Sequence, residues 1–498
     1  MNPLPAAAAL IVCSPHLVAQ EAAEKTPRVF EDPAPPAVHE LEPAAAPPFE
    51  AFDGLRIHRA PGPIPEGAVT EDWPGFLGPR RDGHARETGL LLDWPEGGPP
   101  LVWEMERGEG YASPAVADGR VLFTHRIGGE VHLDCLEAET GKRSWRFSYP
   151  TEYRDRYISN HGPRSTPSIA DGRVYLHGLE GLLVCLELTT GRVVWRRDLQ
   201  KEFGAGTDFF GVVSSPLVYD DLLIQNVGAP GGPTVAAFDR ATGRLVWGAG
   251  EEWGPSCASP VVARVHGRDR LFVLAGGDSR PPTGGLMVLD PATGAVDFTY
   301  PFRSNTYESV NGACPVVDGD RVYISASYGT GTAGLKLLPE GGFEEVWFNR
   351  HLGFQFSTPV FEDGHLHAID GLSHRMGALI ALDPDTGEEL VRTDTDFEER
   401  VQSSTGDEVE RSFSLGEGSL LAVGDRFLAL GDYGHLVLLD LTPRGAAVLE
   451  RTWLFGASET WTPPVLSHGL LYVCQNNPER FGEAPARLLC YDLRAASE

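Results

Sequence analysis

The sequence predicts an all-β fold: an eight-bladed β-propeller of four-stranded antiparallel blades, with the ring closed by the N-terminal strand. Two repeated phrases that alternate along the chain indicate this fold, and so does their order at the two ends. Copies of the first phrase end 42 to 62 residues apart. A repeat of this length that contains several short strands is typical of propeller blades rather than sandwiches.

The first phrase is exemplified by "LVCLELTTGRVVW" at Leu183–Trp195. Two β-rich runs joined by an acidic residue, Thr and Gly predict a hairpin in which Gly takes the positive φ. Full or degenerate copies, and a lone strand at Trp103, give eight outer strands. We expect the aromatic residue at the strand end to lie back over its turn. The structural repeat residues are Trp103, Trp145, Trp195, Trp247, Phe298, Trp347 and Trp453, with Val391 in one copy, and the turn glycines Gly141, Gly191, Gly243, Gly294 and Gly387.

The second phrase is a strand, an Asp-Gly type turn and a second strand, as in "TPSIADGRVYL" from Thr166. Proline near the start of the first strand is permitted there, because its missing N–H interrupts no central ladder. The eight copies begin at Ser113, Thr166, Ser215, Ser259, Cys314, Thr358, Ser419 and Thr462. The two phrases together predict four strands in each repeat.

The order of the phrases at the chain ends predicts how the ring closes. The Trp103 strand precedes the first inner strand, whereas the last repeat stops after "ARLLCYDL" without an outer strand. Leu101–Glu106 is therefore expected to complete the blade formed by 462–466, 470–474 and 488–492. Closure hides sheet edges that an open array would expose. Residues up to Gly98 precede the ring and are expected to be dispensable for it.

The sequence divides into four parts. Residues 1–19 are predicted to be a signal peptide, since Ala6–Val12 is apolar and a cut after Ala19 is suitable. No Lys or Arg precedes that run, so a disordered Ala-rich tail and a lipid anchor at Cys13 remain alternatives. Residues 20–71 are rich in Ala, Pro and Glu and are expected to be a disordered linker. Residues 72–100 are predicted to be a strap on the propeller, which occupies 101–498.

The net charge of the chain excludes some classes of partner, and the positions of the cysteines predict whether they are free thiols. There are 41 Lys and Arg against 70 Asp and Glu, a formal charge of −29. Such a surface repels nucleic acid and anionic membranes, and no apolar stretch is long enough to span a bilayer. Of seven cysteines, Cys135, Cys185 and Cys490 hold one repeat position and are expected to be buried thiols. Whether Cys474 and Cys490 are bridged stays open.

The repeats "LEAETGKRSW", "LELTTGRVVW" and "FDRATGRLVW" resemble those of the pyrroloquinoline-quinone-like (PQQ-like) propeller family. That family includes quinoprotein alcohol dehydrogenases and a non-catalytic outer-membrane assembly lipoprotein. The segments "WPGFLGPRRDGHARETGL" and "GPRSTPSIADGRVYLHG" are similar to an exported bacterial subgroup known by its fold. The resemblance extends from Trp73 to the C-terminus and implies architecture more strongly than activity.

A dehydrogenase of this family holds Ca²⁺ and the quinone at the channel mouth, beside a disulfide of adjacent cysteines. No two cysteines are adjacent in this chain. Calcium needs six to eight oxygen ligands, and the resemblance leaves Glu308 and Asn311 in "NTYESVNGACP" as channel candidates for cofactor binding. A polar loop that caps the ring is the favoured interpretation, because no third carboxylate can be placed beside them.

Three further motifs are weaker. "DPDTGEE" from Asp383 begins like a calcium loop, but its Gly comes one position early, which favours a hairpin turn. His365 and His367 share a strand face, yet a zinc site needs more ligands and His374 lies beyond a turn. His161, Arg164 and Ser165 in "NHGPRSTP" lack a defined base or oxyanion hole, so a hydrogen-bonded loop is favoured.

The sequence therefore predicts an exported, non-catalytic propeller, periplasmic or otherwise extracytoplasmic, that binds a protein, peptide or glycan. The alternative is a dehydrogenase of alcohols or sugars, and pyrroloquinoline quinone and Ca²⁺ are expected only under it. A docking module within a larger complex also fits. No catalytic residue or metal site is assigned, whether the chain is an enzyme stays open with a non-enzyme favoured, and the ligand and oligomeric state are undetermined.

Overall fold

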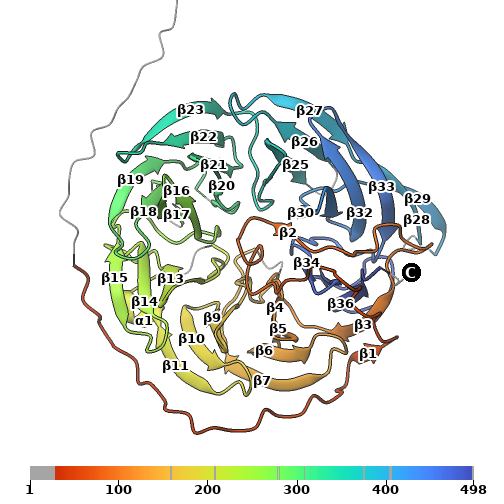
Figure 1. Ribbon diagram of the computed structural model, residues 1–498, viewed down its shortest axis with the longest axis horizontal. Helices are drawn as coiled ribbons and strands as arrows, with labels where there is room; N and C mark the ends of the chain where they lie inside the picture. Colours follow the sequence, from red (N-terminus) through yellow and green to blue (C-terminus); the bar gives the residue numbers. More distant parts are fainter. Residues whose placement is uncertain are drawn as a thin grey trace, which may run out of the picture.

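The computed structural model describes residues 29–157, 160–206, 209–277, 279, 281–307, 309–373, 376–402 and 406–495. Within them, eight sheets with a four-stranded antiparallel core surround a central axis as the blades of a propeller (Figure 1). The predicted all-β class and the eight blades are confirmed. The helix α1 (Leu199–Phe203) is a single short turn between two blades.

Blades 1 to 6 each use four consecutive strands, ordered from the channel outward. Blade 1 contains β4 (Ala115–Ala117), β5 (Arg120–Ile127), β6 (Glu130–Glu137) and β7 (Arg143–Pro150); blade 2, β8 (Ser168–Ala170), β9 (Arg173–His177), β10 (Leu182–Glu187) and β11 (Val193–Asp198); blade 3, β12 (Leu217–Tyr219), β13 (Leu222–Asn226), β14 (Val235–Asp239) and β15 (Leu245–Ala249). Blade 4 contains β16 (Val261–Val265), β17 (Arg268–Ala275), β18 (Gly285–Leu289) and β19 (Val296–Pro301); blade 5, β20 (Val316–Asp318), β21 (Arg321–Ala326), β22 (Gly331–Leu337) and β23 (Phe343–Asn349); blade 6, β24 (Val360–Glu362), β25 (His365–Ser373), β26 (Met376–Leu382) and β27 (Glu389–Asp394).

Blades 7 and 8 each recruit strands from the N-terminal part of the chain. Blade 7 contains β30 (Ser419–Val423), β31 (Arg426–Leu430), β32 (His435–Thr442) and β33 (Gly445–Trp453), with β2 (His84–Ala85) parallel to β30. A hairpin of β28 (Phe397–Gln402) and β29 (Glu408–Phe413) precedes it. Blade 8 contains β34 (Val465–Ser467), β35 (Leu470–Gln475), β36 (Arg487–Asp492) and β3 (Leu101–Glu106), with β1 (Leu55–Ile57) outside β3. β3 runs antiparallel to β36, and Trp103 lies opposite Cys490.

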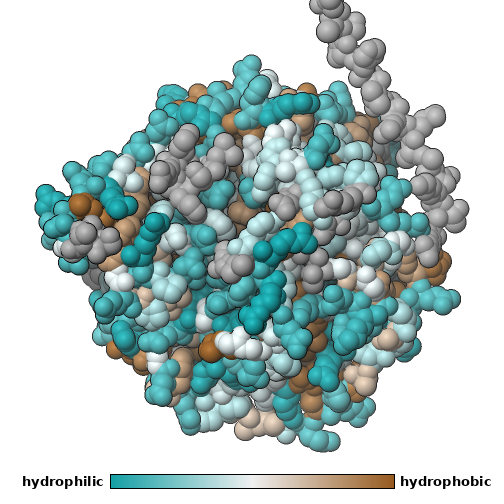
Figure 2. Space-filling view, turned by 180° about the vertical axis from the view of Figure 1, so that it is seen from behind, coloured by the Kyte–Doolittle hydropathy of each residue, from teal (hydrophilic) through white to brown (hydrophobic). Residues whose placement is uncertain are grey.

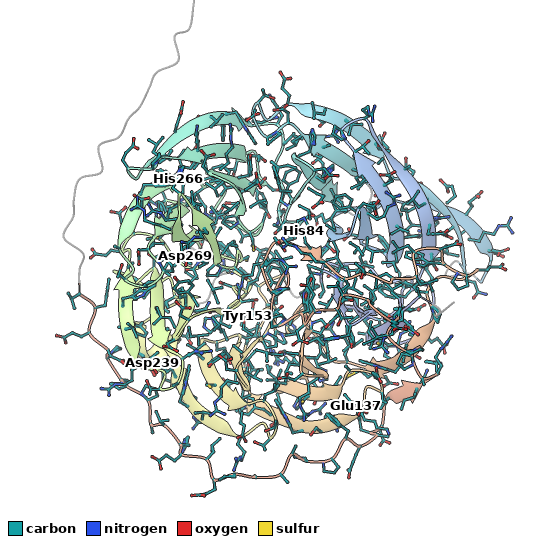
Figure 3. The ribbon with its side chains drawn as sticks, viewed as in Figure 1. His84, Glu137, Tyr153, Asp239, His266 and Asp269 are labelled. Atoms are coloured by element: carbon teal, nitrogen blue, oxygen red, sulfur yellow. The ribbon has the colours of Figure 1, made fainter. Side chains whose placement is uncertain are left out.

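The predicted outer hairpin turns are held by their acidic residue. Asp239 accepts hydrogen bonds from the backbone N–H (2.8 Å) and the hydroxyl (2.7 Å) of Thr242. The Thr140 hydroxyl donates to Glu137 in the same way. Figure 3 labels Glu137 and Asp239 toward the outside of the ring, whereas His84 lies near its centre. The repeated acid-Thr-Gly signature therefore marks the outer rim.

The outer aromatic residues couple each blade to the next. Trp195 is fully buried, and its indole N–H donates to the carbonyl of Arg240 in blade 3 (3.0 Å). Its ring lies against Gly243, which has a φ of +70°, and a Cβ there would lie 2.6 Å from the indole. The pairs Trp103–Gly141, Trp145–Gly191, Trp247–Gly294 and Trp347–Gly387 repeat the arrangement. The expectation that each aromatic residue covers its own turn is wrong, since it covers the turn of the following blade.

Trp453 does not belong to this series. In each blade the outer strand has a β-bulge next to the cross-strand pair that contains the repeat aromatic position. In blade 2 this pair is Cys185 and Trp195. In blade 7 the bulge follows Leu438, whose partner is Glu450. Trp453 instead stacks on His435 at 5.4 Å and donates its indole N–H to Tyr433 in its own blade (2.8 Å). The longer turn of this repeat shifts the register by three residues, so its assignment as a repeat position is corrected.

Residues 29–60, which we call the arm, lie along the outer strands of blades 3, 2, 1 and 8 (Figure 1, red chain). The contacts, in chain order, are Asp32 with Arg197 (2.6 Å) and Leu245 N (2.8 Å), His39 N with Val194 O (2.8 Å), Glu50 with Arg143 (3.0 and 2.9 Å), and β1 with β3. The expected disordered linker is thus ordered over its described part. A proline-rich chain is already extended and loses little entropy when it binds a strand edge.

Residues 72–98, which we call the strap, cross the middle of the ring (Figure 1). Trp73 is 2% exposed and exchanges two backbone hydrogen bonds with Val116 (2.8 and 2.7 Å). Trp73 and Trp94 belong to the same buried cluster as Trp103. Residues up to Gly98, which were expected to be dispensable for the ring, therefore supply part of its core.

The cysteines inside the described residues are buried thiols without a disulfide. Cys474 Sγ faces the carbonyl of Ala112 (3.9 Å), and Cys490 Sγ faces that of Ala138 (4.0 Å), so the two are not bridged. The predictions for the first 28 residues, a signal peptide or a lipid anchor at Cys13, lie outside the described part of the chain.

Candidate functional site

The strap enters the axial channel, where the family resemblance placed a cofactor, and a cavity of about 650 Å³ remains between the strap and the inner strands of blades 4 to 7. Phe76 and Leu77 pack against Val261 of β16 and Cys314, which precedes β20. The Arg81 guanidinium donates to the carbonyl oxygens of Pro260 (3.0 Å) and Pro216. Desolvation lowers the pKa of Arg81 to about 10, so it remains a cation at neutral pH. Arg81 thus places a positive charge at the start of the inner strands of blades 3 and 4.

Of the two channel candidates, Asn311 is described and Glu308 is not. Asn311 is 1% exposed and its amide N–H groups donate to the carbonyls of Ala275 (2.9 Å) and Phe302 (3.1 Å). These bonds tie the loop after β19 to blade 4. The favoured interpretation of a structural loop therefore fits Asn311, which points its donors at the protein.

The described residues do not fit a calcium-quinone site. Calcium requires several carboxylate or carbonyl oxygens around one point, and no three His, Cys, Asp or Glu side chains of the described part gather to hold a metal ion. The buried Arg81 cation would also oppose a second cation in the channel. No step of a quinone reaction is derived from this arrangement.

The three weaker motifs serve local structure. Asp383 Oδ1 accepts the backbone N–H groups of Asp385 (2.8 Å) and Thr386 (2.9 Å), as in the other outer turns. His367 is 2% exposed and packs on Phe427 at 5.0 Å, while His374 lies outside the described residues. Arg164 pairs with Asp155 at 2.8 Å. None of them forms a reactive arrangement with its described neighbours.

Sequence reasoning missed a buried charged network on β5, β6 and β7. His125 Nε2 lies 3.0 Å from Asp134 Oδ2, and Arg146 donates to both Asp134 oxygens (2.6 and 2.7 Å). The Gly108 N–H donates to His125 Nδ1 (2.9 Å), and burial lowers the pKa of His125. Both ring nitrogens are occupied and the side chain is fully buried, so the pair cannot accept a substrate proton. Alternating polar residues in "HRIGGEVHLD" were its only sequence signal.

Asp134 should make stability depend on acid. Burial alone would raise its pKa, but hydrogen bonds from Arg146 and His125 lower the pKa to about 2. Since this is below the ordinary value of ~3.9, the stabilisation is present above about pH 4 and is lost as pH falls toward 2. Asp134→Asn should cost about 3–5 kcal/mol in urea unfolding at pH 7, with a smaller difference near pH 3. Glu130→Gln, an exposed change on the same strand, is the control. An equal cost at both pH values would contradict this assignment.

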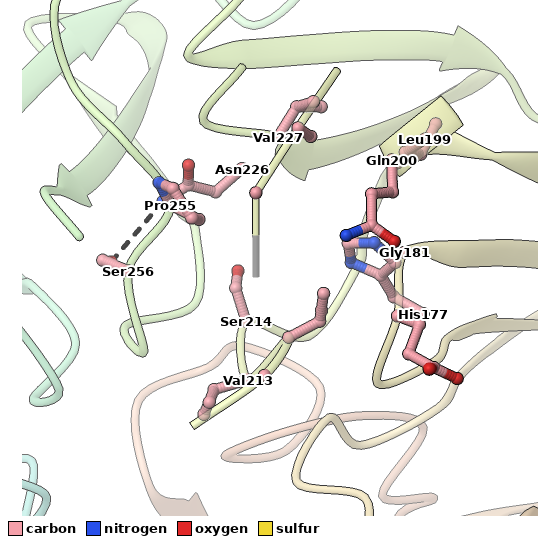
Figure 4. A pocket seen from close by; sticks show the side chains of 15 residues that line it. His177, Gly181, Leu199, Gln200, Val213, Ser214, Asn226, Val227, Pro255 and Ser256 are labelled. Carbon is pink, nitrogen blue, oxygen red and sulfur yellow. Dashed lines mark hydrogen bonds between the residues drawn. The ribbon is translucent and has the colours of Figure 1, made fainter. Parts of the chain in front are cut away.

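A small pocket lies between blades 2 and 3 (Figure 4). It is lined in part by His177, Ser214, Asn226 and Ser256, and Asn226 donates to Ser256 Oγ at 3.5 Å. Desolvation lowers the pKa of His177 to about 3, which leaves it neutral. Apart from Glu180, no residue that lines this pocket carries a charge at neutral pH.

Aromatic residues gather where the loops between blades converge. This aromatic loop cluster contains Tyr111, Tyr157, Phe210, Tyr307, Phe356 and Trp461, each from a different inter-blade loop. Trp461 contacts Tyr111 (5.4 Å) and Phe356 (5.3 Å), and Tyr157 contacts Phe210 (5.5 Å). Phe356, Phe210 and Tyr307 pack on a shared buried base of Phe209, Cys257 and Val310. The cluster is continuous and half exposed.

Polar groups border the cluster. The Tyr111 hydroxyl donates to Glu459 (2.6 Å), and Arg164 lies 5.3 Å from the Tyr111 ring. Tyr157 is 45% exposed. Figure 2 shows the face behind the view of Figure 1, where hydrophilic and near-neutral residues prevail and strongly hydrophobic ones are scattered. Half-exposed aromatic residues with a polar rim are the usual composition of a protein-binding surface.

A protein-family model agrees with this architecture. The model described as "Outer membrane protein assembly factor BamB" matches residues 129–393, more than half of the chain. The chain belongs to this BamB family. Among the described residues, the structure contains no helix with the length and hydrophobicity that crossing a bilayer requires.

Curated relatives of the chain carry two kinds of name. An outer membrane protein assembly factor BamB of Kangiella koreensis is 27% identical over 44% of this chain and 48% of that protein. The dehydrogenase subunit of a quinone alcohol dehydrogenase of Gluconobacter oxydans is 32% identical over 23% of this chain and 16% of that subunit. The matches thus span less than half the length of these relatives.

Solved structures share the fold. A europium-containing methanol dehydrogenase has a TM-score of 0.58 at 12% identity, over 85% of this chain and 98% of its own. BamB from Moraxella catarrhalis has a TM-score of 0.51 at 16% identity, over 80% and 98%. At these identities both structures show the fold alone, which agrees with the predicted PQQ-like propeller.

Proposed function

We propose that the chain is an exported, non-catalytic propeller that binds another protein through the aromatic loop cluster and acts as a scaffold in outer membrane protein assembly. The observation that carries the proposal is the continuous, half-exposed cluster of aromatic residues from six inter-blade loops. Membership of the BamB family and the names of its relatives support the protein partner and a periplasmic location. A glycan is a less suitable ligand, because Arg164, which borders the cluster, is already paired with Asp155.

The proposal requires no cofactor. The alternative, a dehydrogenase that uses pyrroloquinoline quinone and Ca²⁺, is tested by incubating the full chain with both and measuring dye reduction with alcohols and sugars. Turnover that disappears on chelation would favour the dehydrogenase and remove the basis for a pure scaffold.

The binding surface is tested by photo-cross-linking in cells of the source organism. A benzophenone amino acid replaces Tyr157 on the cluster or, as control, Val69 beside the strap, which is 55% exposed. We expect one discrete protein adduct at position 157 and none at position 69. Trp461→Ala should reduce the adduct at least about tenfold, as loss of a central aromatic contact does.

The variant Trp461→Ala must keep its unfolding midpoint for this comparison, and Phe210→Ala provides a second test on another loop. Equal labelling from positions 157 and 69, or a ladder of many adducts, would contradict a specific surface at the cluster.

A further inference from the structure

The outer strands of blades 4, 5 and 6 are open edges. β19, β23 and β27 each end their sheet, and no described segment pairs with them on the outside. The arm covers the outer strands of blades 3, 2, 1 and 8, whereas no described segment lies outside β19, β23 and β27, which follow one another from the left over the top of the ring in Figure 1. The outer strand of blade 7, β33, differs from these three, because the β28–β29 hairpin contacts it: Glu399 of the hairpin pairs with Arg451 of β33 (2.6 Å). Three consecutive edges therefore lack a cover among the described residues.

The open edges repeat the backbone geometry that the arm uses. Arg143 of β7 and Leu245 of β15 each lie next to the β-bulge of their strand. The N–H of Arg143 donates to the carbonyl of Glu50, and the N–H of Leu245 donates to the carboxylate of Asp32. Val296, Glu345 and Glu389 hold the same place in register on β19, β23 and β27. Each edge can therefore accept an extended chain as the arm-covered edges do.

The arm matches the charge of the charged strands that it covers. β7 and β11 carry four Arg and one Asp, and there the arm places carboxylates such as Asp32, which pairs with the fully buried Arg197. β3 carries Glu104 and Glu106, and there the arm places Arg56 at 3.7 and 3.9 Å from them. The sign of the arm charge thus changes with the sign of the strand charge.

The open strands are acidic. They carry Asp297, Glu344, Glu345, Glu389 and Asp394 against the single Arg392. Asp297 is paired with Arg270 (3.2 Å) and Glu389 with Arg392 (2.8 Å), whereas Glu344 and Asp394 are exposed. Val296, Phe348 and Leu390 add apolar surface at 45%, 41% and 40% exposure. A second copy of the arm would be repelled, because residues 29–57 contain six carboxylates and one Arg.

We propose that β19, β23 and β27 bind an extended, basic and apolar segment of a partner protein by strand addition, completing around blades 4 to 6 the belt that the arm forms elsewhere. This rests on the proposed function only in taking the partner to be a protein. Asp32 to Arg56 spans four blades, so a segment of about 20 residues would cover three.

The probe is a fluorescent peptide with the sequence of residues 29–57 in which the six carboxylates become lysine: Glu31→Lys, Asp32→Lys, Glu40→Lys, Glu42→Lys, Glu50→Lys and Asp53→Lys. Fluorescence anisotropy with the full chain should show saturable binding on the order of tenfold tighter than a scrambled peptide of the same composition, and no binding of the native sequence. Photo-cross-links from the benzophenone-substituted position of Phe49 should map to β19, β23 or β27.

Two triple variants with the same change of net charge distinguish binding at the open edges from general attraction between a basic peptide and an acidic protein. Glu344→Lys, Glu345→Lys and Glu389→Lys together should weaken the probe on the order of tenfold. Glu96→Lys, Glu130→Lys and Glu483→Lys, at exposed positions elsewhere, should not. Equal binding of the scrambled peptide, equal weakening by both triples, or cross-links at the aromatic loop cluster would overturn the proposal. The Tyr157 cross-link would still report on the scaffold function separately.

Discussion

A chain that lacks residues 1–107 is expected to aggregate, whereas a chain that lacks only residues 1–60 should remain soluble and fold cooperatively. The longer deletion removes β3, whose Val102, Trp103 and Met105 are fully buried. It thereby exposes the edge of β36 in an otherwise closed ring. Long hydrophobic edges of this kind pair with other chains. Removal of the arm instead exposes outer edges that carry charged side chains, and should only lower the unfolding midpoint.

A third chain, without residues 1–98, tests the contribution of the strap. It keeps β3 but loses Trp73 and Trp94 from the core and β2 from blade 7. We expect it to stay soluble at low temperature, with an unfolding midpoint well below that of the chain without residues 1–60. Gel filtration and thermal melts of the three chains provide the comparison. Equal solubility and stability after removal of 1–98 and of 1–107 would show that the ring does not close through Trp103.

The parts of the fold that repeat could be predicted from the sequence, because each blade has the same hairpins and the same acid-Thr-Gly turn. The strap was expected to lie on the propeller, but its path through the middle of the ring could not be predicted, and neither could the course of the arm. The contacts of both segments are with strands of several different blades and impose no period on the chain. Trp453 shows the same limit at one residue: a longer turn changed the register, and the residue type alone did not reveal it. The aromatic loop cluster combines one residue from each of six loops, so no local motif identifies it.

Trp195→Ala should be among the most destabilising single substitutions in the chain, at about 3–5 kcal/mol in urea unfolding. The side chain is fully buried between blades 2 and 3, and its loss leaves a cavity and removes the donor to Arg240. Trp453→Ala is the matched control: this ring is only partly buried and lies beside Phe413 and Phe481 without covering the turn of the next blade, so about 1–2 kcal/mol is expected. A ligand-binding defect with an unchanged unfolding midpoint would show that Trp195 serves binding and not packing.

Gly243→Ala tests the same contact from the other side. The residue has a φ of +70°, and its new methyl group would lie 2.6 Å from the Trp195 ring. Left-handed backbone strain and overpacking together should cost about 2–4 kcal/mol. In the double variant with Trp195→Ala the methyl group enters the space that the indole leaves, so the two losses should be less than additive by about 1 kcal/mol or more. Strict additivity would mean that the tryptophan and the turn of the next blade do not stabilise each other, and blade coupling would have to be assigned to other contacts.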